Sequence, residues 1–588
     1  MSAPASFGPL VTDSGVRFRL WAPAARSVTL LLDRSHPMQA KPDGWHETLI
    51  ASARAGTRYR FRIDDEIDVP DPASHFQPED VNGPSEVIDH GYTWRSEDWK
   101  GRPWHDAVIS ELHVGTFTPE GSLRAAIDKL DQLVATGITA IELMPLADFF
   151  GRWNWGYDGV LLYAPDSAYG RPEDLKALID AAHMRGLMVF LDVVYNHFGP
   201  EGNYLGRYAP AFFTKASTPW GSAIDYRVPQ VRSFVIENAL HWLREYRFDG
   251  LRLDAVHAIV EPGEPHILQA LSEAVGALAQ QSGRLIHLVL ENDHNQASLL
   301  DPETEKPAGK YRAQWNDDYH HAFHVLLTGE HFGYYEDYRE PGPLLARTLA
   351  QGFAYQGEPS PHRHDAPRGE PSGYLPTTAF VNFIQNHDQI GNRARGDRLT
   401  TLVTAPALDA ALTITLLVPM PPLLFMGEEW GAREPFPFFC DFRGGLAKAV
   451  REGRKREFAE AYAETPQEIP DPLAECTVRA ATLDWVAVKE PEHHQRLELV
   501  TRLLAVRRLQ IAPLLPALQV GSGRAAFKDG MLVASWRFSS ARKLSLIANM
   551  TAQPQPYPEH DPGTMIWGDE PTATLAPWSV HAALGVAS

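Results

Sequence analysis

Apolar segments with a strand pattern alternate with helical stripes through the middle of the chain. The apolar run at 107–112 is followed by a helix that Ser122 caps, with Leu123, Ile127 and Leu130 on one face. Further apolar strands are predicted at 138–143, 187–194, 250–253, 286–290, 314–315, 379–384 and 422–426. Eight apolar strands separated by helical patterns predict an α/β fold in which parallel strands close into a barrel.

Short β patterns flank this barrel on both sides. The segments at 16–21 and 59–63 alternate apolar and polar residues, as strands of a half-buried sheet do. Similar patterns recur near the end of the chain, at 531–536 and 543–547. The expected parts are an N-terminal β-sandwich at 1–100, a (β/α)8 TIM barrel with insertions at 101–512, and a small C-terminal β domain at 513–588.

One polar insertion interrupts the barrel pattern at 355–374 and is rich in Pro, Gly, His and Arg. A long polar loop within a compact domain is typically either functional or disordered. The sequence leaves these two interpretations equally open.

Composition limits the kinds of partner that the protein is expected to bind and the cellular compartment in which it is expected. The 588 residues include 54 Lys and Arg against 74 Asp and Glu, so the formal net charge is −20 and a polyanion would be repelled. We therefore expect neither nucleic acid nor a membrane as a partner. Only Cys440 and Cys476 are present, which excludes a disulfide framework and a cysteine-rich metal site. With no leader pattern and no long apolar run, we expect a soluble, cytoplasmic protein.

Carboxylates and histidines follow four of the predicted strands. A single carboxylate at a strand end is more often a helix cap or half of an ion pair. Several carboxylates converging at the carboxyl ends of barrel strands are costly to bury, and such sites tend to be functional. The four segments are 192–197, 249–257, 291–294 and 385–389.

Two of these carboxyl groups suit glycoside hydrolysis, which needs one ionised and one protonated group. Arg252 and Asp254 are two residues apart on a strand, so they share a face, and the guanidinium would keep Asp254 ionised as a nucleophile. Glu291 has no neighbouring cation in sequence, and nearby carboxylates would raise its pKa, as an acid requires. Asp388, next to His387, could hold sugar hydroxyls. A metal site at these residues is disfavoured because Arg252 would repel the ion.

The motifs DVVYNH, GLRLDAVH, the strand end at Glu291 and QNHD resemble the four signature regions of the α-amylase family of glycoside hydrolases. The resemblance implies a retaining double displacement in which Asp254 is the nucleophile, Glu291 the acid/base and Asp388 the stabiliser of the transition state. It also implies an N-terminal region like a carbohydrate-binding module. By the same resemblance, the sugar at the cleaved bond is held by Arg252, His197, His387 and Tyr157.

The segments at 314–321, 385–392, 427–431 and 435–442 are similar to the trehalose-releasing members of that family. This implies hydrolysis of the α-1,4 bond between a maltooligosyl chain and a terminal trehalose, as part of trehalose biosynthesis. The expected ligands are maltooligosyltrehalose and other α-glucans, with no cofactor and no required metal. The further residues expected to bind substrate are His257, Asp317, Asp318, His320, His321, Gln389 and Asn392.

Some of these interpretations have alternatives. Asp317 and Asp318 could instead cap a helix, and Trp220 and the aromatic residues at 436–439 could be either sugar platforms or core. A glycogen branching or debranching enzyme would use the same carboxylates with another acceptor. A non-catalytic glucan-binding protein is the alternative of another class, and it would be expected to lack at least one of the three acids.

Overall fold

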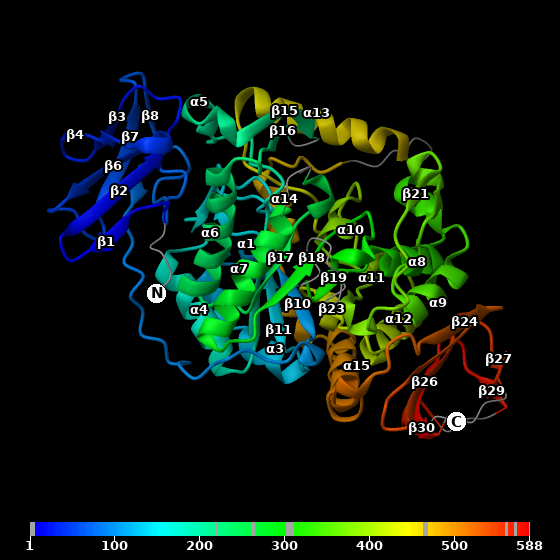
Figure 1. Ribbon diagram of the computed structural model, residues 1–588. Helices are drawn as coiled ribbons and strands as arrows, with labels where there is room; N and C mark the ends of the chain where they lie inside the picture. Colours follow the sequence, from blue (N-terminus) through cyan, green and yellow to red (C-terminus); the bar gives the residue numbers. More distant parts are fainter. Residues whose placement is uncertain are drawn as a thin grey trace.

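The computed structural model describes residues 6–218, 221–259, 265–300, 311–461, 469–558, 563–569 and 573–586. A barrel forms the centre of the molecule, and one β region lies at each side of it (Figure 1). The N-terminal strands, in blue, and the C-terminal strands, in red, are separated by the whole width of the barrel. The predicted α/β fold with flanking β regions is therefore confirmed.

The central sheet has eight parallel strands, each within or beside a predicted apolar run. Its order is β22-β19-β18-β17-β14-β11-β10-β23, and a parallel bridge between Asn382 and Pro422 joins its two edges. Six of the strands are shorter than their apolar runs, with only two residues in β22, whereas β17 spans its whole run and β19 is one residue longer. The strands are β10 (Ile109–Leu112), β11 (Ala140–Leu143), β14 (Met188–Val193), β17 (Gly250–Leu253), β18 (His287–Leu290), β19 (Ala313–Trp315), β22 (Phe380–Val381) and β23 (Leu423–Phe425).

Helices surround this sheet. Further helices and strands lie in the loops. The surrounding helices are α2 (Leu123–Ile127), α3 (Leu130–Thr136), α4 (Pro172–Met184), α6 (Pro229–Glu245), α7 (Ile267–Ser282), α8 (Asp317–Thr328), α9 (Pro341–Gln351), α12 (Ala405–Leu417) and α15 (Pro491–Val506). The loop elements are α1 (Val114–Phe117), α5 (Leu205–Tyr208), α10 (His387–Gly391), α11 (Leu399–Leu402), α13 (Gly444–Ala461), α14 (Glu475–Ala481), β12 (Ala147–Asp148), β13 (Leu161–Pro165), β15 (Phe213–Thr218) and β16 (Gly221–Ile224).

The helix ends follow local sequence signals. Pro172 opens α4, and the Asp174 carboxylate accepts a hydrogen bond from the Arg171 amide at 2.9 Å. The helix predicted after Ser122 is in fact two helices, α2 and α3. The amides of Asp128 and Lys129 bond to carbonyls three residues back, which tightens the turn between them.

The N-terminal region is a β-sandwich whose strands alternate buried and more exposed positions. One sheet has the order β1-β2-β6-β5, and the other has β4-β3-β7-β8 with β9 paired to β7. Phe18 and Tyr59 meet edge-on in its core, with ring centroids 4.8 Å apart. The strands are β1 (Leu10–Thr12), β2 (Gly15–Trp21), β3 (Val28–Leu31), β4 (Ser35–Pro37), β5 (Gln39–Ala40), β6 (Trp45–Ile50), β7 (Arg58–Ile63), β8 (Ile67–Val69) and β9 (Ser85–Glu86).

The C-terminal region is antiparallel and packs on α9. Its main sheet has the order β24-β25-β26-β30-β28, and β27 pairs with β29. Trp536 is fully buried, and its indole N–H donates to the Leu349 carbonyl of α9 at 3.0 Å. The strands are β24 (Arg524–Lys528), β25 (Met531–Arg537), β26 (Arg542–Asn549), β27 (Gln555–Pro556), β28 (Thr564–Trp567), β29 (Thr574–Leu575) and β30 (Val580–Val586).

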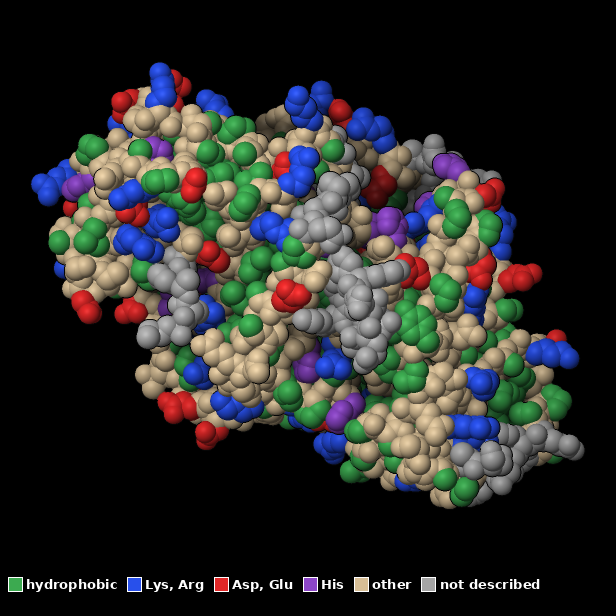
Figure 2. Space-filling view, in the orientation of Figure 1, with side chains coloured by type: hydrophobic (Ala, Val, Ile, Leu, Met, Phe, Trp, Pro, Cys, Tyr) green, Lys and Arg blue, Asp and Glu red, His purple; other side chains and the backbone are tan. Residues whose placement is uncertain are grey.

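Within the described part of the chain, no helix has both the length and the apolar run that crossing a membrane requires. Acidic and basic side chains are interspersed over the face drawn in Figure 2.

Asp249, just before β17, joins several parts of the barrel wall. Its carboxylate is fully buried and accepts from Trp99 Nε1, His183 Nε2 and the Val189 amide, each at 2.8 Å. Arg284 Nη2 lies 3.5 Å from the other side of the carboxylate. Four segments distant in sequence thus depend on one buried charge.

Replacing Asp249 by Ala should destabilise the protein by about 3 kcal/mol, because the buried partners lose their acceptor. Urea unfolding followed by tryptophan fluorescence would measure the change. Asp131→Ala is the matched control, since its ion pair with Arg185 is at the surface and should contribute little. Equal effects of the two substitutions would contradict this account.

Candidate active site

A cavity of about 400 Å³ opens at the carboxyl ends of the barrel strands. It brings together residues that the sequence places on six different strand ends or loops. The predicted residues that line it are Tyr157, His197, Asp254, His257, Glu291, Asp317, His321, His387, Asp388, Gln389 and Asn392.

Arg252 lies beneath this cavity and organises the acids. It is fully buried on β17, with its guanidinium over the Trp315 ring at 4.1 Å. Nη1 donates to Asp254 Oδ1 at 2.7 Å and to Asp192 Oδ2 at 2.8 Å. Asn196 Nδ2 donates to the other oxygen of Asp254 at 2.9 Å. Both Asp254 oxygens therefore face donors, an arrangement that favours a carboxylate over a carboxylic acid.

Glu291 follows β18 and has a different environment. The Ala255 amide donates to Glu291 Oε2 at 2.5 Å, and Arg252 Nη2 is 3.9 Å from the same oxygen. Glu291 has no cation beside it in the sequence, but the fold brings Arg252 close to it. Its pKa is nevertheless raised well above the ordinary value, because burial and the charge of Asp254 outweigh Arg252. A raised pKa is what the role of proton donor requires of Glu291.

Ala255, which directly follows Asp254 in the chain, has a left-handed backbone with φ of 40°. This conformation is uncommon for a residue with a Cβ atom and is often found at functional sites. Here it turns the amide toward Glu291, so the backbone strain serves to position the acid.

On the opposite side of the cavity, His387 lies between Asp388 and Glu111. His387 Nδ1 is hydrogen-bonded to Glu111, and Nε2 is 3.5 Å from Asp388 Oδ1. Burial alone would lower the pKa of His387, but the charges of Asp388 and Glu111 raise it to about 9. A cation therefore sits beside Asp388 at neutral pH. Glu111, an isolated acid in the apolar strand β10, was missed by the sequence analysis.

Tyr157 forms part of the floor. Its hydroxyl donates to Asp192 Oδ2 at 2.7 Å, and its ring stacks on His387 with centroids 5.0 Å apart. His197 Nε2 is 3.0 Å from the Tyr157 carbonyl, which can accept its N–H. Burial raises the pKa of Asp192 to about 7. The floor is thus a set of hydrogen-bonded groups held rigid before any sugar enters.

The insertion at 355–374 supplies one wall of the cavity. It forms a hairpin of β20 (Glu358–Ser360) and β21 (Ala366–Arg368), so the functional alternative is favoured over disorder. Arg363 pairs with Asp293, and Arg368 Nη2 is 3.2 Å from the same carboxylate. Burial would raise the pKa of Asp293, but these two arginines lower it. Polar residues of the insertion thus reach the site, although no hydrophobic periodicity in the sequence predicts their position.

Several lining residues were not predicted to bind substrate. For three of them, the cluster of His and Arg in the insertion was a sequence signal that could have indicated substrate binding. The others lie on separate loops. These residues are Trp155, Asp293, Tyr334, Asp337, His362, Arg363 and Arg368.

Asp318 and His320 do not line the cavity, which corrects their assignment to direct substrate contact. Asp318 is fully buried and accepts from the amides of Ala354 and Tyr355 at 2.7 and 3.1 Å. His320 is hydrogen-bonded to the Ile384 carbonyl and the Tyr335 hydroxyl. Both support the wall from behind. A helix starting at Asp317 turns successive side chains to different sides, so adjacent residues cannot all face one cavity.

The aromatic candidates divide between core and cavity. Phe436 is fully buried and stacks on Trp155 at 5.3 Å, and Phe439 is also buried. Phe438 lines the cavity. Trp220 lies outside the described residues.

In chemical terms, the cavity holds one carboxyl group faced by donors and another with a raised pKa. Glycoside hydrolysis uses this pair as a base or nucleophile and an acid. Among the described residues, the acids and histidines of this cavity do not converge closely enough to form a group of metal ligands. The pair of carboxyl groups is suited to acid–base and nucleophilic chemistry.

Replacing Glu111 by Gln removes a charge that raises the pKa of His387, so His387 should titrate at lower pH. NMR of ¹³C-labelled histidine would follow it. Because the folded pKa of about 9 exceeds the ordinary value of about 6.5, this interaction stabilises the fold fully below the latter and is lost as pH rises through 9. The variant should lose less stability over that range. An unchanged His387 titration would contradict the assigned role of Glu111.

The chain matches two family models. Alpha amylase, catalytic domain, matches residues 92–218, and carbohydrate-binding module 48 (isoamylase N-terminal domain) matches residues 6–74. The putative alpha amylase from Salmonella typhimurium has a solved structure that superimposes with a TM-score of 0.94 at 47% identity, covering 99% of this chain and 100% of that chain. The barrel and the N-terminal sandwich are thus those of an α-amylase-type glycoside hydrolase.

Curated relatives narrow the assignment. The malto-oligosyltrehalose trehalohydrolase of Deinococcus radiodurans is 45% identical over 505 residues, 85% of this chain and 82% of that protein. The enzyme of the same name from Saccharolobus solfataricus is 42% identical over 486 residues, 82% of this chain and 84% of that protein. The chain therefore belongs to the malto-oligosyltrehalose trehalohydrolase family, within the α-amylase group of glycoside hydrolases.

Proposed function

We propose that this protein hydrolyses the α-1,4 bond that joins a maltooligosyl chain to a terminal trehalose, and so releases trehalose. The proposal rests on one observation, the different positions of Asp254 and Glu291 relative to Arg252. Asp254 accepts its hydrogen bond at 2.7 Å, whereas Glu291 lies 3.9 Å away with a raised pKa. Membership of the family supplies the substrate class, maltooligosyltrehalose and related α-glucans.

The reaction proceeds in two displacements at one anomeric carbon. Glu291 donates its proton to the glycosidic oxygen, trehalose leaves, and Asp254 forms a bond to the anomeric carbon. Glu291 then takes a proton from water, which displaces Asp254 and frees the maltooligosaccharide with retained configuration. Retention corresponds to a separation of about 5–5.5 Å between the two carboxyl groups.

Asp388 stabilises the positive charge that develops on the sugar ring. It lines the cavity beside His387, whose Nε2 lies 3.5 Å from Asp388 Oδ1 and whose pKa is raised to about 9. Tyr157, on the floor, offers the face of a ring to the sugar at the cleaved bond. The other proposed substrate contacts are His197, His257, Asp317, His321, His387, Gln389 and Asn392.

Two further assignments belong to this proposal. Residues 101–512 form the catalytic domain, between a glucan-binding N-terminal region at 1–100 and the β domain at 513–588. A cytoplasmic location is supported by the two unpaired cysteines, Cys440 and Cys476.

The competing function is that of a branching or debranching enzyme, since either would use the same three acids. Digestion of maltooligosyltrehalose with product identification separates them. We expect free trehalose and a shortened maltooligosaccharide as the products. New α-1,6 linkages, or linear chains released from glycogen without trehalose, would overturn the proposal.

Glu291→Gln keeps the shape of the side chain but removes the proton donor. Turnover should fall by at least ~10²-fold, the lower range for general acid catalysis. In the wild type, activity should persist above the ordinary pKa of a glutamate and fall as pH rises through the raised pKa of Glu291. Steady-state kinetics of trehalose release would measure both.

The matched control for this substitution is Glu490→Gln, the same change at an exposed position before α15. Its turnover should equal that of the wild type. If Glu291→Gln retained wild-type turnover, Glu291 would not be the acid.

A further inference from the structure

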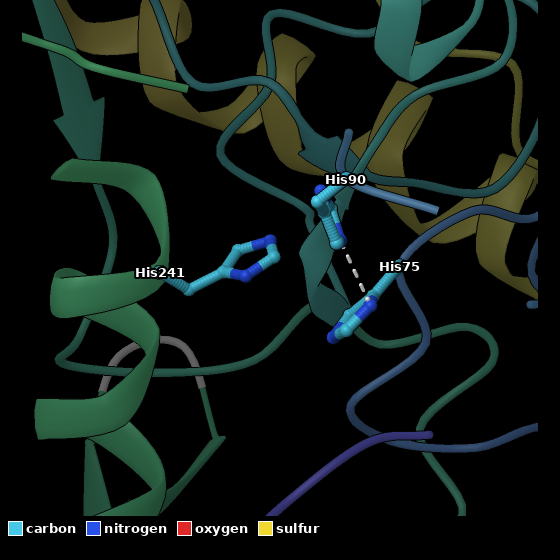
Figure 3. A group of neighbouring side chains, drawn as sticks. All are labelled: His75, His90 and His241. Atoms are coloured by element: carbon cyan, nitrogen blue, oxygen red, sulfur yellow. Dashed lines mark hydrogen bonds between the residues drawn. The ribbon is translucent and has the colours of Figure 1, made fainter. Parts of the chain in front are cut away.

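Three histidines converge where the N-terminal region meets the barrel. His75 lies in the connection between β8 and β9, His90 follows β9, and His241 is on α6. In Figure 3 the ring of His241 reaches from its helix toward His75 and His90, which stand on neighbouring connecting segments. The proposed catalytic function does not use any of them.

The ligand atoms of this group are close together. One ring nitrogen from each histidine lies within 4.8 Å of the other two. His90 Nε2 and His75 Nδ1 are hydrogen-bonded at 3.0 Å, and the rings of His75 and His241 stack with centroids 4.7 Å apart. Among the described residues, this is the group in which three ligand-type side chains converge at such distances.

The hydrogen bonds leave lone pairs available. His241 Nε2 lies 3.2 Å from the Tyr163 carbonyl, which accepts its N–H, so Nδ1 carries the lone pair of the ring. A backbone carbonyl on the second nitrogen is also the usual way in which proteins orient a metal-binding histidine. Between His75 and His90, one nitrogen must act as acceptor, so at least one of these rings is neutral.

The group borders a cavity of about 700 Å³ that leaves room for a further ligand such as water. Three carboxylates, Asp89, Glu237 and Glu245, line the same cavity. They face two cations, Arg244 in the lining and Lys176, whose Nζ is 2.6 Å from the His90 carbonyl and 3.4 Å from His90 Nδ1. The five charges formally sum to −1, but the cations are the ones that act on the rings, so binding of a metal ion depends on the carboxylates of the cavity to offset Lys176 and Arg244.

We propose that His75, His90 and His241 bind one divalent transition-metal ion, with Zn²⁺ as the occupant. Imidazole nitrogens suit zinc, whereas calcium and magnesium require oxygen ligands. Tetrahedral zinc at about 2.0–2.1 Å from each nitrogen places ligand atoms roughly 3.4 Å apart. Binding would therefore require loss of the His75–His90 hydrogen bond and rotation of the stacked His75 and His241 rings, so that all three lone pairs point at the ion.

The ion would cross-link two parts of the chain. His75 and His90 belong to the segments that run from the sandwich to the barrel, and His241 belongs to a barrel helix. Zinc that binds the folded chain more tightly than the unfolded chain raises thermal stability by mass action. The site is thus a metal clamp between the N-terminal region and α6, and it is independent of the proposed hydrolytic reaction.

Zinc binding to the full-length chain tests this directly. Protein stripped with EDTA and given one equivalent of ZnCl₂ should retain about one zinc per chain after gel filtration, measured by inductively coupled plasma mass spectrometry. Chelator competition gives the affinity, which should fall at least ~10-fold in His241→Gln and His90→Gln. The control His494→Gln removes an exposed histidine of α15 and should leave the affinity unchanged.

Thermal unfolding gives a second measurement. Zinc should raise the midpoint of the wild type and of His494→Gln but not that of His241→Gln. Because a variant could fail to fold, cobalt added to the wild type provides a test without substitutions: a visible spectrum of a tetrahedral site and X-ray absorption features of imidazole ligands are expected. Less than stoichiometric zinc in the wild type, unchanged affinity in a folded His241→Gln variant, or cobalt spectra without imidazole ligands would overturn the proposal.

Discussion

The buried guanidinium of Arg252 is the interaction on which the catalytic end of the barrel depends. Asp192, Asp254 and Glu291 meet in a space largely closed to water, where uncompensated carboxylates would be strongly unfavourable. One cation cannot neutralise three acids equally. It bonds directly to Asp192 and Asp254 and only approaches Glu291. Arg252 thus compensates Asp192 and Asp254 by direct hydrogen bonds, while burial and the charge of Asp254 keep the pKa of Glu291 raised.

The barrel makes this possible because parallel strands bring distant residues to one end. β14, β17 and β18 are neighbours in the sheet, and their ends carry Asp192, Asp254 and Glu291. On the other side, Glu111 of β10 reaches His387, which in turn holds Asp388. Two buried cations, Arg252 and His387, therefore stand on opposite sides of the cavity with acids around each. Removal of either would leave carboxylates competing for protons at the same site.

Much of this arrangement follows from sequence periodicity. Each apolar run of the barrel marked a strand, and residues that directly follow the strands, such as Asp254 and Glu291, were identified as the chemistry of the site. The contact between Arg252 and Glu291 could not be predicted, since it depends on the register of β17 against β18. Asp318 was expected to bind substrate because its segment resembles the family, but one step along a helix from Asp317 turns the side chain away from the cavity.

The insertion hairpin supplies the cation that pairs with Asp318 at its buried position. Arg368 is almost fully buried, with Asp318 at 3.1 Å, Asp293 at 3.2 Å and Asp337 at 4.0 Å. As at Arg252, a buried cation lies among several acids, but Arg368 belongs to the insertion and not to a strand of the barrel. Without the hairpin, Asp318 would be a buried carboxylate without its cation, at the start of the helix that carries Asp317 and His321. The wall of the cavity and the insertion therefore fold as one unit, and the shape of the cleft on this side is set by the insertion as much as by the barrel.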